Sequence, residues 1–501
     1  MTTIATPLGN VTEVRREGYQ VFRGIRYARA PVGERRFAPP VPVDAWTGDY
    51  DATQFGASAP QPAPDIAGPL QAQPEPTDED CLFLNVYTPA ADDRRRPVLF
   101  WIHGGGYVSG SGRAYNGRAF VSEHDVVVVT INYRMGPIGF MHVGHLSPEL
   151  GESVNNGILD QICALEWTRD NIEAFGGDPG NVLIFGESAG GTSTAMLVGC
   201  PRAQGLFHKA VIHSPHVDLI EVGDGHEAFT NGLVERLGGD PATNGLVTLR
   251  SASIDQLIAL GPDPDAESSP SLAIRRPEAV GFSPAIDGGL IPRAVTETIR
   301  QDGCVPFLGG GCRHEGTLFA QIAGVGECTE AEAAQIFASE GFDGAAGLAV
   351  YEQFAPGSTP RQKLTYALTD TMFRNSMVRL LDAAAEAGTH CWSWMCTWET
   401  DQFAGSLRAT HAIELGFLWA WRDASGQVNS FGGSNPPQNL GPTMRAYWAS
   451  FARDGVPSAA GEPPWPQHNT AERPVLVLDS ERRVEQRLDD AVRRYWFGGA
   501  D

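Results

Sequence analysis

Residues 181–191 read Asn-Val-Leu-Ile-Phe-Gly-Glu-Ser-Ala-Gly-Gly. The apolar residues 182–185 favour β-structure and predict a buried strand. The next five residues fit G-x-S-x-G, in which a serine lies on a sharp turn from strand to helix. Glycine two positions before and after the serine lets the helix pass close to the strand, because glycine has no Cβ. The alternative is a glycine-rich turn with an incidental serine. We predict that Ser188 is a nucleophile and that the Ala189 N–H faces the substrate oxygen.

A second glycine-rich segment, His103-Gly104-Gly105-Gly106-Tyr107, follows the apolar residues 97–102. Three successive glycines allow backbone N–H groups to face a ligand without side chains in the way. Esterases and lipases complete an oxyanion hole with a loop of this type. The segment therefore predicts donors that act together with the Ala189 N–H, although a flexible turn is the alternative. We expect His103 to brace the loop rather than to transfer protons.

Apolar strands alternate with helical segments along most of the chain, which indicates an α/β fold with a doubly wound, mostly parallel sheet. The whole chain, residues 1–501, is predicted as one domain with helical insertions at about 220–300 and 325–390. Prolines and glycines predict loops at 57–78, 262–271 and 426–442. Strands are expected at 81–87, 97–102, 125–131, 182–185, 209–213, 305–309 and 391–398, and helices at 156–175, 192–198, 329–339, 362–387 and 444–453.

The formal net charge is −23, because 37 Lys and Arg residues face 60 Asp and Glu residues. This acidity argues against a nucleic-acid or anionic-membrane partner. No apolar run reaches transmembrane length, and the first 25 residues lack the pattern of a signal peptide. Eight cysteines form no C-x-x-C pair and no zinc-finger spacing, so we expect free thiols and no metal.

A serine hydroxyl needs a base within hydrogen-bond reach and an acid to orient that base. In this arrangement the chain order is Ser, Asp or Glu, His. The residue pattern alone does not choose the base, although a loop position after a strand favours His390 or His411. The histidines after Ser188 are at positions 208, 213, 216, 226, 314, 390, 411 and 468.

The chain resembles the type-B carboxylesterase/lipase family, which includes liver carboxylesterases and cholinesterases. The resemblance runs from about Gly24 to Asp479 and implies the α/β-hydrolase fold and a Ser-Glu-His triad. Several long motifs in the same order carry it, at residues 24–28, 79–87, 103–106, 132–137, 171–179 and 185–191.

Matched to the family's motifs, the acid is Glu315 in His-Glu-Gly-Thr-Leu-Phe and the base is His411 in His-Ala-Ile-Glu-Leu-Gly-Phe. The alternative acid is Glu187, but its position next to Ser188 should direct its side chain away from the serine Oγ. The resemblance further implies that Ser214 supports the acid, although Pro215 stands where glycine is usual. The oxyanion donors of the family correspond to the N–H groups of Gly105, Gly106 and Ala189.

The resemblance implies hydrolysis of small-molecule carboxylic esters by water, without a cofactor. Amide or carbamate hydrolysis and acyl transfer use the same machinery and remain alternatives, as does a non-catalytic, esterase-like binding protein. Ala59 replaces the cysteine with which secreted members pair the Cys81 position. The missing bridge and the missing signal peptide predict a bacterial, cytoplasmic member. No tryptophan occurs in residues 60–80, which argues against a choline esterase. The oligomeric state stays open, with a monomer among the options.

Overall fold

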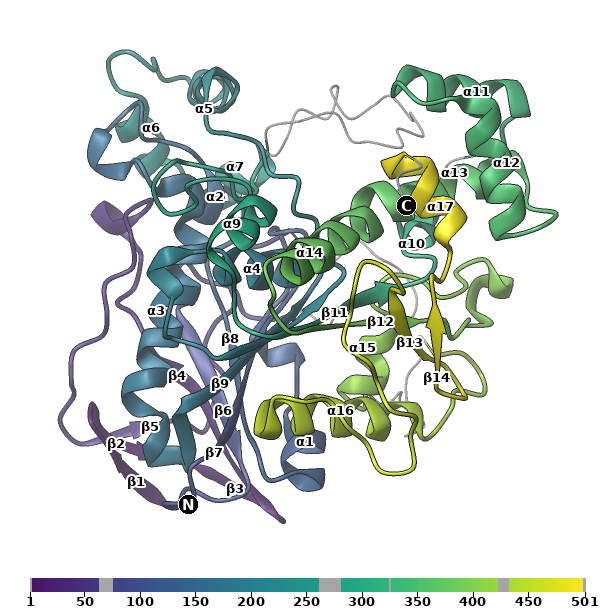
Figure 1. Ribbon diagram of the computed structural model, residues 1–501. Coiled ribbons are helices and arrows are strands. Elements are labelled where there is room, and N and C mark those ends of the chain that lie inside the picture. The colour runs from purple at the N-terminus through teal and green to yellow at the C-terminus, as the bar shows by residue number, and fades with distance from the viewer. Residues whose placement is uncertain (1, 63–74, 261–280, 324–325, 422–431, 499–501) are drawn as a thin grey trace.

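The structure, a computed structural model, describes residues 2–62, 75–260, 281–323, 326–421 and 432–498. Its centre is an eleven-stranded sheet (Figure 1). The strands are parallel from β8 through β13 in the sheet order, and antiparallel at both edges. In spatial order they are β14 (Arg483–Gln486), β13 (Pro474–Leu478), β12 (Cys391–Cys396), β11 (Phe307–Cys312), β10 (Lys209–His213), β9 (Gly177–Glu187), β7 (Arg96–Ile102), β8 (Val127–Ile131), β6 (Phe83–Thr88), β4 (Tyr19–Arg26) and β3 (Val14–Arg16).

The central strands are buried on both faces, which explains their nearly continuous apolar sequences. Successive residues of β7 point to opposite sides of the sheet, so Phe100 joins one hydrophobic cluster while Leu99 and Trp101 join another. Strand β9 alternates in the same way, with Ile184 in the first cluster and Phe185 in the second. The sheet therefore separates two cores.

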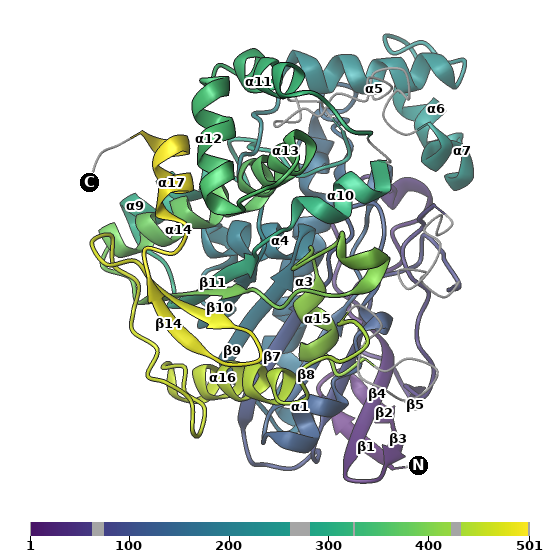
Figure 2. The same cartoon turned by 90° about the vertical axis from the view of Figure 1, so that its right-hand side faces the viewer.

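Each core is closed by its own set of helices (Figure 2). One face is covered by α3 (Asn156–Asn171), α4 (Ala189–Val198), α9 (Val295–Asp302) and α14 (Asn375–Glu386). The other is covered by α1 (Arg118–Glu123), α15 (Ile413–Leu418) and α16 (Leu440–Asp454). This is the doubly wound arrangement that the alternating strands and helices predict.

The remaining elements lie around this sandwich. A small sheet near the N-terminus contains β1 (Thr3–Thr6), β2 (Gly9–Thr12) and β5 (Asp49–Asp51). A separate helical cluster with its own apolar core contains α11 (Glu330–Ser339), α12 (Gly344–Phe354), α13 (Pro360–Thr369) and α17 (Asp490–Phe497). The other helices are α2 (Gly136–Phe140), α5 (Asp224–Arg236), α6 (Gly245–Ser251), α7 (Ile254–Ala259) and α10 (Gly316–Ala323).

The predicted mostly parallel sheet is confirmed, whereas several element boundaries are wrong. The predicted strand 305–309 begins at Phe307 and continues to Cys312, because its glycines are paired with β10 and β12 rather than forming a loop. Residues 426–431 of the loop predicted at 426–442 lie outside the described residues. The predicted end of that loop is wrong, since α16 already begins at Leu440. The expected helix 362–387 contains a π-helical turn, Asp370–Arg374. The loop 262–271 lies outside the described residues, and the single-domain interpretation stays a prediction.

All eight cysteines are free thiols, including Cys81, which is packed in the same core cluster as Ala59. No helix in the described ranges is long and apolar enough to cross a bilayer.

A buried ion pair joins α3 to the segment that follows β8. The guanidinium of Arg134 donates to both carboxylate oxygens of Asp160, at 2.8 and 2.7 Å, and both side chains are fully buried. The Arg134 backbone N–H also donates to Asp160, and the guanidinium donates to the Ala38 carbonyl. These bonds satisfy a cation that would otherwise be costly inside the core.

We expect Asp160→Asn to lower the free energy of unfolding by about 3–5 kcal/mol, because it leaves the buried Arg134 charge without its counterion. Denaturant unfolding of the purified protein measures the loss. Asp170→Asn on the same helix is the matched control, because the Arg169–Asp170 pair is about half exposed and should change stability by less than about 1 kcal/mol. Equal losses in the two variants would contradict this account.

Candidate active site

Ser188 lies on a strained turn between β9 and α4. Its φ of 58° and ψ of −123° are not values that a non-glycine residue ordinarily adopts. The surrounding backbone holds this conformation: the Ser188 N–H donates to the carbonyl of His213 on β10, and its own carbonyl accepts from the N–H of Thr192. The turn therefore has the strained strand-to-helix form that G-x-S-x-G predicts.

The glycines around Ser188 are required by close backbone contacts. A Cβ on Gly190 would lie 2.1 Å from the carbonyl oxygen of Ile102, at the end of β7. A Cβ on Gly186 would lie 2.4 Å from the carbonyl oxygen of Gly190. Helix α4 therefore begins directly against the ends of the neighbouring strands, as the sequence pattern predicts.

The glycine segment after β7 lies against the same turn. A Cβ on Gly104 would be 3.1 Å from the Cβ of Ser188. Gly105 has a φ of 109°, which favours glycine, and its carbonyl accepts N–H groups from Val108 and Ser109. The structure thus brings Gly104, at the start of this segment, against the turn at Ser188. The function of the N–H groups of Gly105, Gly106 and Ala189 as oxyanion donors stays a prediction.

His103 braces this segment. Its Nδ1 lies 2.9 Å from the Gly104 carbonyl, its ring is stacked on Tyr133, and the Tyr133 hydroxyl donates to the His103 carbonyl. Burial lowers the pKa of His103 to about 4, so the imidazole is neutral. These contacts fit a structural residue.

Glu315 and His411 are in direct contact. The Nδ1 atom of His411 lies 2.5 Å from Oε2 of Glu315, and both side chains are buried. Glu315 lies three residues after the end of β11, while His411 lies two residues before the start of α15. Of the two histidines that the loop position favours, His411 therefore has the carboxylate partner, and His390 lies exposed before β12.

The other oxygen of Glu315 is held by two donors. The Ser214 hydroxyl and the Cys312 backbone N–H each lie 2.6 Å from Oε1. Ser214 has a φ of 47°, so the backbone keeps an unusual conformation there although Pro215 follows. The carboxylate is thus fixed on one side by β10 and β11 and offers its other oxygen to His411.

Glu187 lies beside the ring of His411 without contacting the ring nitrogen that Glu315 contacts, and the expectation that its side chain turns away from the serine Oγ stays a prediction. Its Oε1 lies 3.1 Å from Nε2 of His411, the ring nitrogen opposite to the one that Glu315 contacts. Glu187 is the last residue of β9, and its carboxylate lies within the core beside the ring of His411. Burial raises the pKa of Glu187 to about 8, although the cationic form of His411 opposes this rise.

Buried hydrogen bonds around Glu414 support the segment that carries His411. Trp448 donates its indole N–H to Nε2 of His213, so Nδ1 of His213 carries the proton and donates to Glu414 at 3.1 Å. The thiol of Cys312 donates to the other oxygen of Glu414. Burial disfavours the charged carboxyl of Glu414, yet these hydrogen bonds hold its pKa below the usual value. Because Glu414 is three residues after His411, the network anchors the start of α15.

Several residues that position His411 and Glu315 were not predicted from the sequence. Phe373 stacks on the ring of His411 with centroids 4.6 Å apart, and Phe319 lies at 5.2 Å. Glu414 and Phe319 do belong to the two quoted motifs, whereas His213 and Cys312 had another signal: they end parallel strands, and open α/β sheets carry their sites there. In the part of the chain that the structure describes, the side chains that could hold a metal are His142, His145 and Glu227, and they include none of these residues.

Comparisons with known proteins give one consistent result. A sequence model described as "Carboxylesterase family" matches residues 2–496. The para-nitrobenzyl esterase of Bacillus subtilis is 31% identical, over 99% of this chain and 98% of that protein. The phenmedipham hydrolase of Pseudarthrobacter oxydans is 31% identical, over 96% and 94%. A carboxylesterase structure from Geobacillus stearothermophilus superimposes with a TM-score of 0.84 at 34% identity, covering 99% of this chain and all of the other.

The contact between Glu187 and His411 predicts a shifted pH profile. Burial disfavours the imidazolium of His411, but the Glu187 and Glu315 carboxylates outweigh this and raise its pKa to about 9. A base must be neutral to accept a proton, so kcat/KM for a p-nitrophenyl ester should rise with pH through this raised, shared titration. Glu187→Gln removes one carboxylate and should move the acid limb to lower pH. Initial rates across pH measure the shift.

Glu173→Gln changes an exposed glutamate that pairs with Arg95 instead of His411, and it should leave the acid limb in place. An unchanged or upward-shifted midpoint in Glu187→Gln would show that Glu187 does not set the protonation of the base.

Proposed function

Because this chain belongs to the carboxylesterase family and is a carboxylic ester hydrolase, we propose that it acts through a Ser188-Glu315-His411 triad and a covalent acyl-enzyme. The observation that carries the proposal is the 2.5 Å contact between His411 and Glu315, in the same site as the strained Ser188 turn. A carboxylate on Nδ1 keeps the proton there, so Nε2, which also lies 3.1 Å from Glu187, is the nitrogen that accepts the proton of the serine.

In the acylation step, the Ser188 hydroxyl oxygen attacks the ester carbonyl while Nε2 of His411 takes its proton. The carbonyl oxygen becomes an oxyanion that accepts hydrogen bonds from the N–H groups of Gly105, Gly106 and Ala189. One such donor typically contributes about 10²–10³-fold to the rate. The C–O bond to the alcohol then breaks, and His411 returns the proton to the leaving oxygen.

In deacylation, His411 takes a proton from water, and the resulting hydroxide attacks the acyl-enzyme. Collapse of the second tetrahedral intermediate releases the carboxylic acid and returns the proton to Ser188. Glu315 stabilises the imidazolium in both steps, and Ser214 and Cys312 keep its carboxylate in place. Small-molecule esters and water are the substrates. The assignment to a bacterial cytoplasm stays a prediction, and the oligomeric state stays open.

The nucleophile assignment predicts the position of a covalent adduct. An organophosphate should phosphorylate Ser188 and abolish ester hydrolysis in parallel, because the strained turn exposes the serine Oγ beside the proposed oxyanion donors. Intact mass and peptide mapping locate the adduct. Ser188→Ala should stay folded, lose the adduct and lose roughly 10⁴-fold or more in kcat.

Ser193→Ala is the control for this experiment, because Ser193 lies on the same helix but contacts Tyr107 and Gln161 instead. It should still be labelled at Ser188. Loss of activity together with modification of a different serine would overturn the assignment.

The acid assignment predicts a tautomer effect. In Glu315→Gln, the amide oxygen can keep the bonds from Ser214 and Cys312, which turns the NH₂ group toward Nδ1 of His411. The imidazole would then carry its proton on Nε2, where it cannot accept one from Ser188. We expect kcat to fall up to about 10⁴-fold with little change in fold. Glu187→Gln should cost much less, and the opposite order in two folded variants would exclude Glu315 as the acid.

A further inference from the structure

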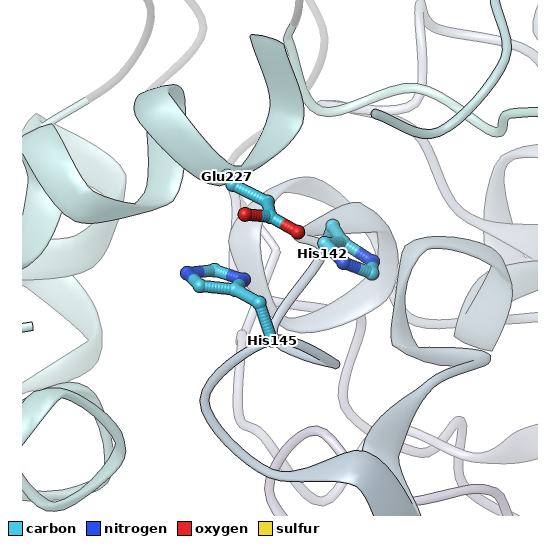
Figure 3. Close-up of side chains that lie close together, drawn as sticks. All are labelled: His142, His145 and Glu227. Carbon is cyan, nitrogen blue, oxygen red and sulfur yellow. The ribbon is translucent and has the colours of Figure 1, made fainter. Parts of the chain in front are cut away.

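A cluster of nitrogen and oxygen ligands lies apart from the triad, where helix α5 meets the segment after α2. His142 and His145 come from that segment, in the sequence His-Val-Gly-His, and Glu227 comes from the first turn of α5. One ligand atom from each of the three side chains lies within 4.8 Å of the others. In Figure 3 the Glu227 carboxylate points from its helix toward both imidazole rings.

One of the two histidines is held in the tautomer that a metal ligand needs, and both have an unpartnered ring nitrogen. Nε2 of His145 lies 2.9 Å from the amide oxygen of Asn231, which can only accept, so Nε2 carries the proton. The lone pair is therefore on Nδ1. The Nδ1 atoms of both His145 and His142 are buried and have no hydrogen-bond partner. A metal-binding histidine ordinarily donates its second ring N–H in this way, which fixes its tautomer.

The local charges favour a neutral imidazole beside a carboxylate. The His226 ring centroid lies 6.4 Å from that of His142, and His226 is itself buried. Glu227 is exposed and can adjust its position, while it contributes a full negative charge. Two neutral imidazoles and one carboxylate are typical ligands of Zn²⁺.

We propose that His142, His145 and Glu227 bind a zinc-class divalent cation that fastens α5 to the segment after α2. Ligand atoms about 2.0–2.1 Å from a tetrahedral Zn²⁺ lie about 3.4 Å apart. The three ligand atoms lie within 4.8 Å of one another, so each pair must close by at most about 1.4 Å. The fourth position is left to water. This departs from the expectation of no metal, which considered Cys and His spacings along the chain alone.

The neighbouring contacts already join the same two segments. The Thr230 hydroxyl of α5 donates to the His142 carbonyl, and Asn231 of α5 contacts His145. A cation at this point adds a third connection between residues that are 82 positions apart, 145 and 227. Because the ligand set forms only in the folded chain, zinc binding stabilises the native state.

Equilibrium dialysis with Zn²⁺ alone tests the proposal on the full chain, after treatment with a chelator. We expect one tightly bound zinc per chain and an increase in the melting temperature, with no comparable effect of Mg²⁺, which prefers oxygen ligands. Glu227→Gln, an exposed change that should leave the fold intact, should weaken zinc binding at least about tenfold. The double variant His142→Ala, His145→Ala should abolish it.

Two matched variants control for zinc bound elsewhere. Glu235→Gln changes an exposed glutamate on the same helix, and His390→Ala removes an exposed histidine outside the cluster. Both should bind zinc like the parent chain. Absence of stoichiometric binding in the parent, or full retention in Glu227→Gln and in the double variant, would overturn the proposal.

Discussion

The backbone turn at Ser188 is the constraint on which the site depends. It combines a positive φ with helix α4 beginning directly against the ends of β7 and β10. No side chain fits between these backbones, so Gly186 and Gly190 are needed at those positions. The strain is held in place by the parallel strands on both sides, which are buried in two separate cores. A large sheet thus serves to keep one residue in an unfavourable conformation.

Local patterns predicted the parts of the fold that depend on local forces. The strand at Lys209–His213 was predicted with its observed bounds because both faces of this sheet are buried, which makes the segment continuously apolar. Prediction failed where tertiary contacts override propensity. The glycines of β11 are poor strand formers, yet ladders on both sides extend the strand to Cys312. Similarly, Leu440–Pro442 was assigned to a loop, although proline is well tolerated in the first turn of a helix such as α16.

The candidate site also combines features encoded locally in the sequence with features that depend on long-range contacts. The Ser188 turn is encoded within five residues, so the sequence identifies it. The partnership of Glu315 with His411 joins residues 96 positions apart, and only family resemblance selected that histidine among eight. The contact of Glu187 with Nε2 of His411 could not be predicted, because adjacency in the chain does not determine where a buried carboxylate turns. The cluster of His142, His145 and Glu227 could not be predicted from local patterns, because Glu227 lies on a different element from the two histidines.

The π-helical turn at Asp370–Arg374 has a consequence for the long helical stretch around it. A π turn holds one residue more than an α turn, which rotates everything beyond it by about 100° about the axis. The side chains before and after the π turn therefore face different directions around the helix axis. Its first part, α13, faces α10 and α12, while its second part, α14, faces α9 and β12. Phe373 lies within the π turn. The ring that stacks on His411 therefore comes from the point where the helical stretch passes from the core of the helical cluster to a core of the central sheet.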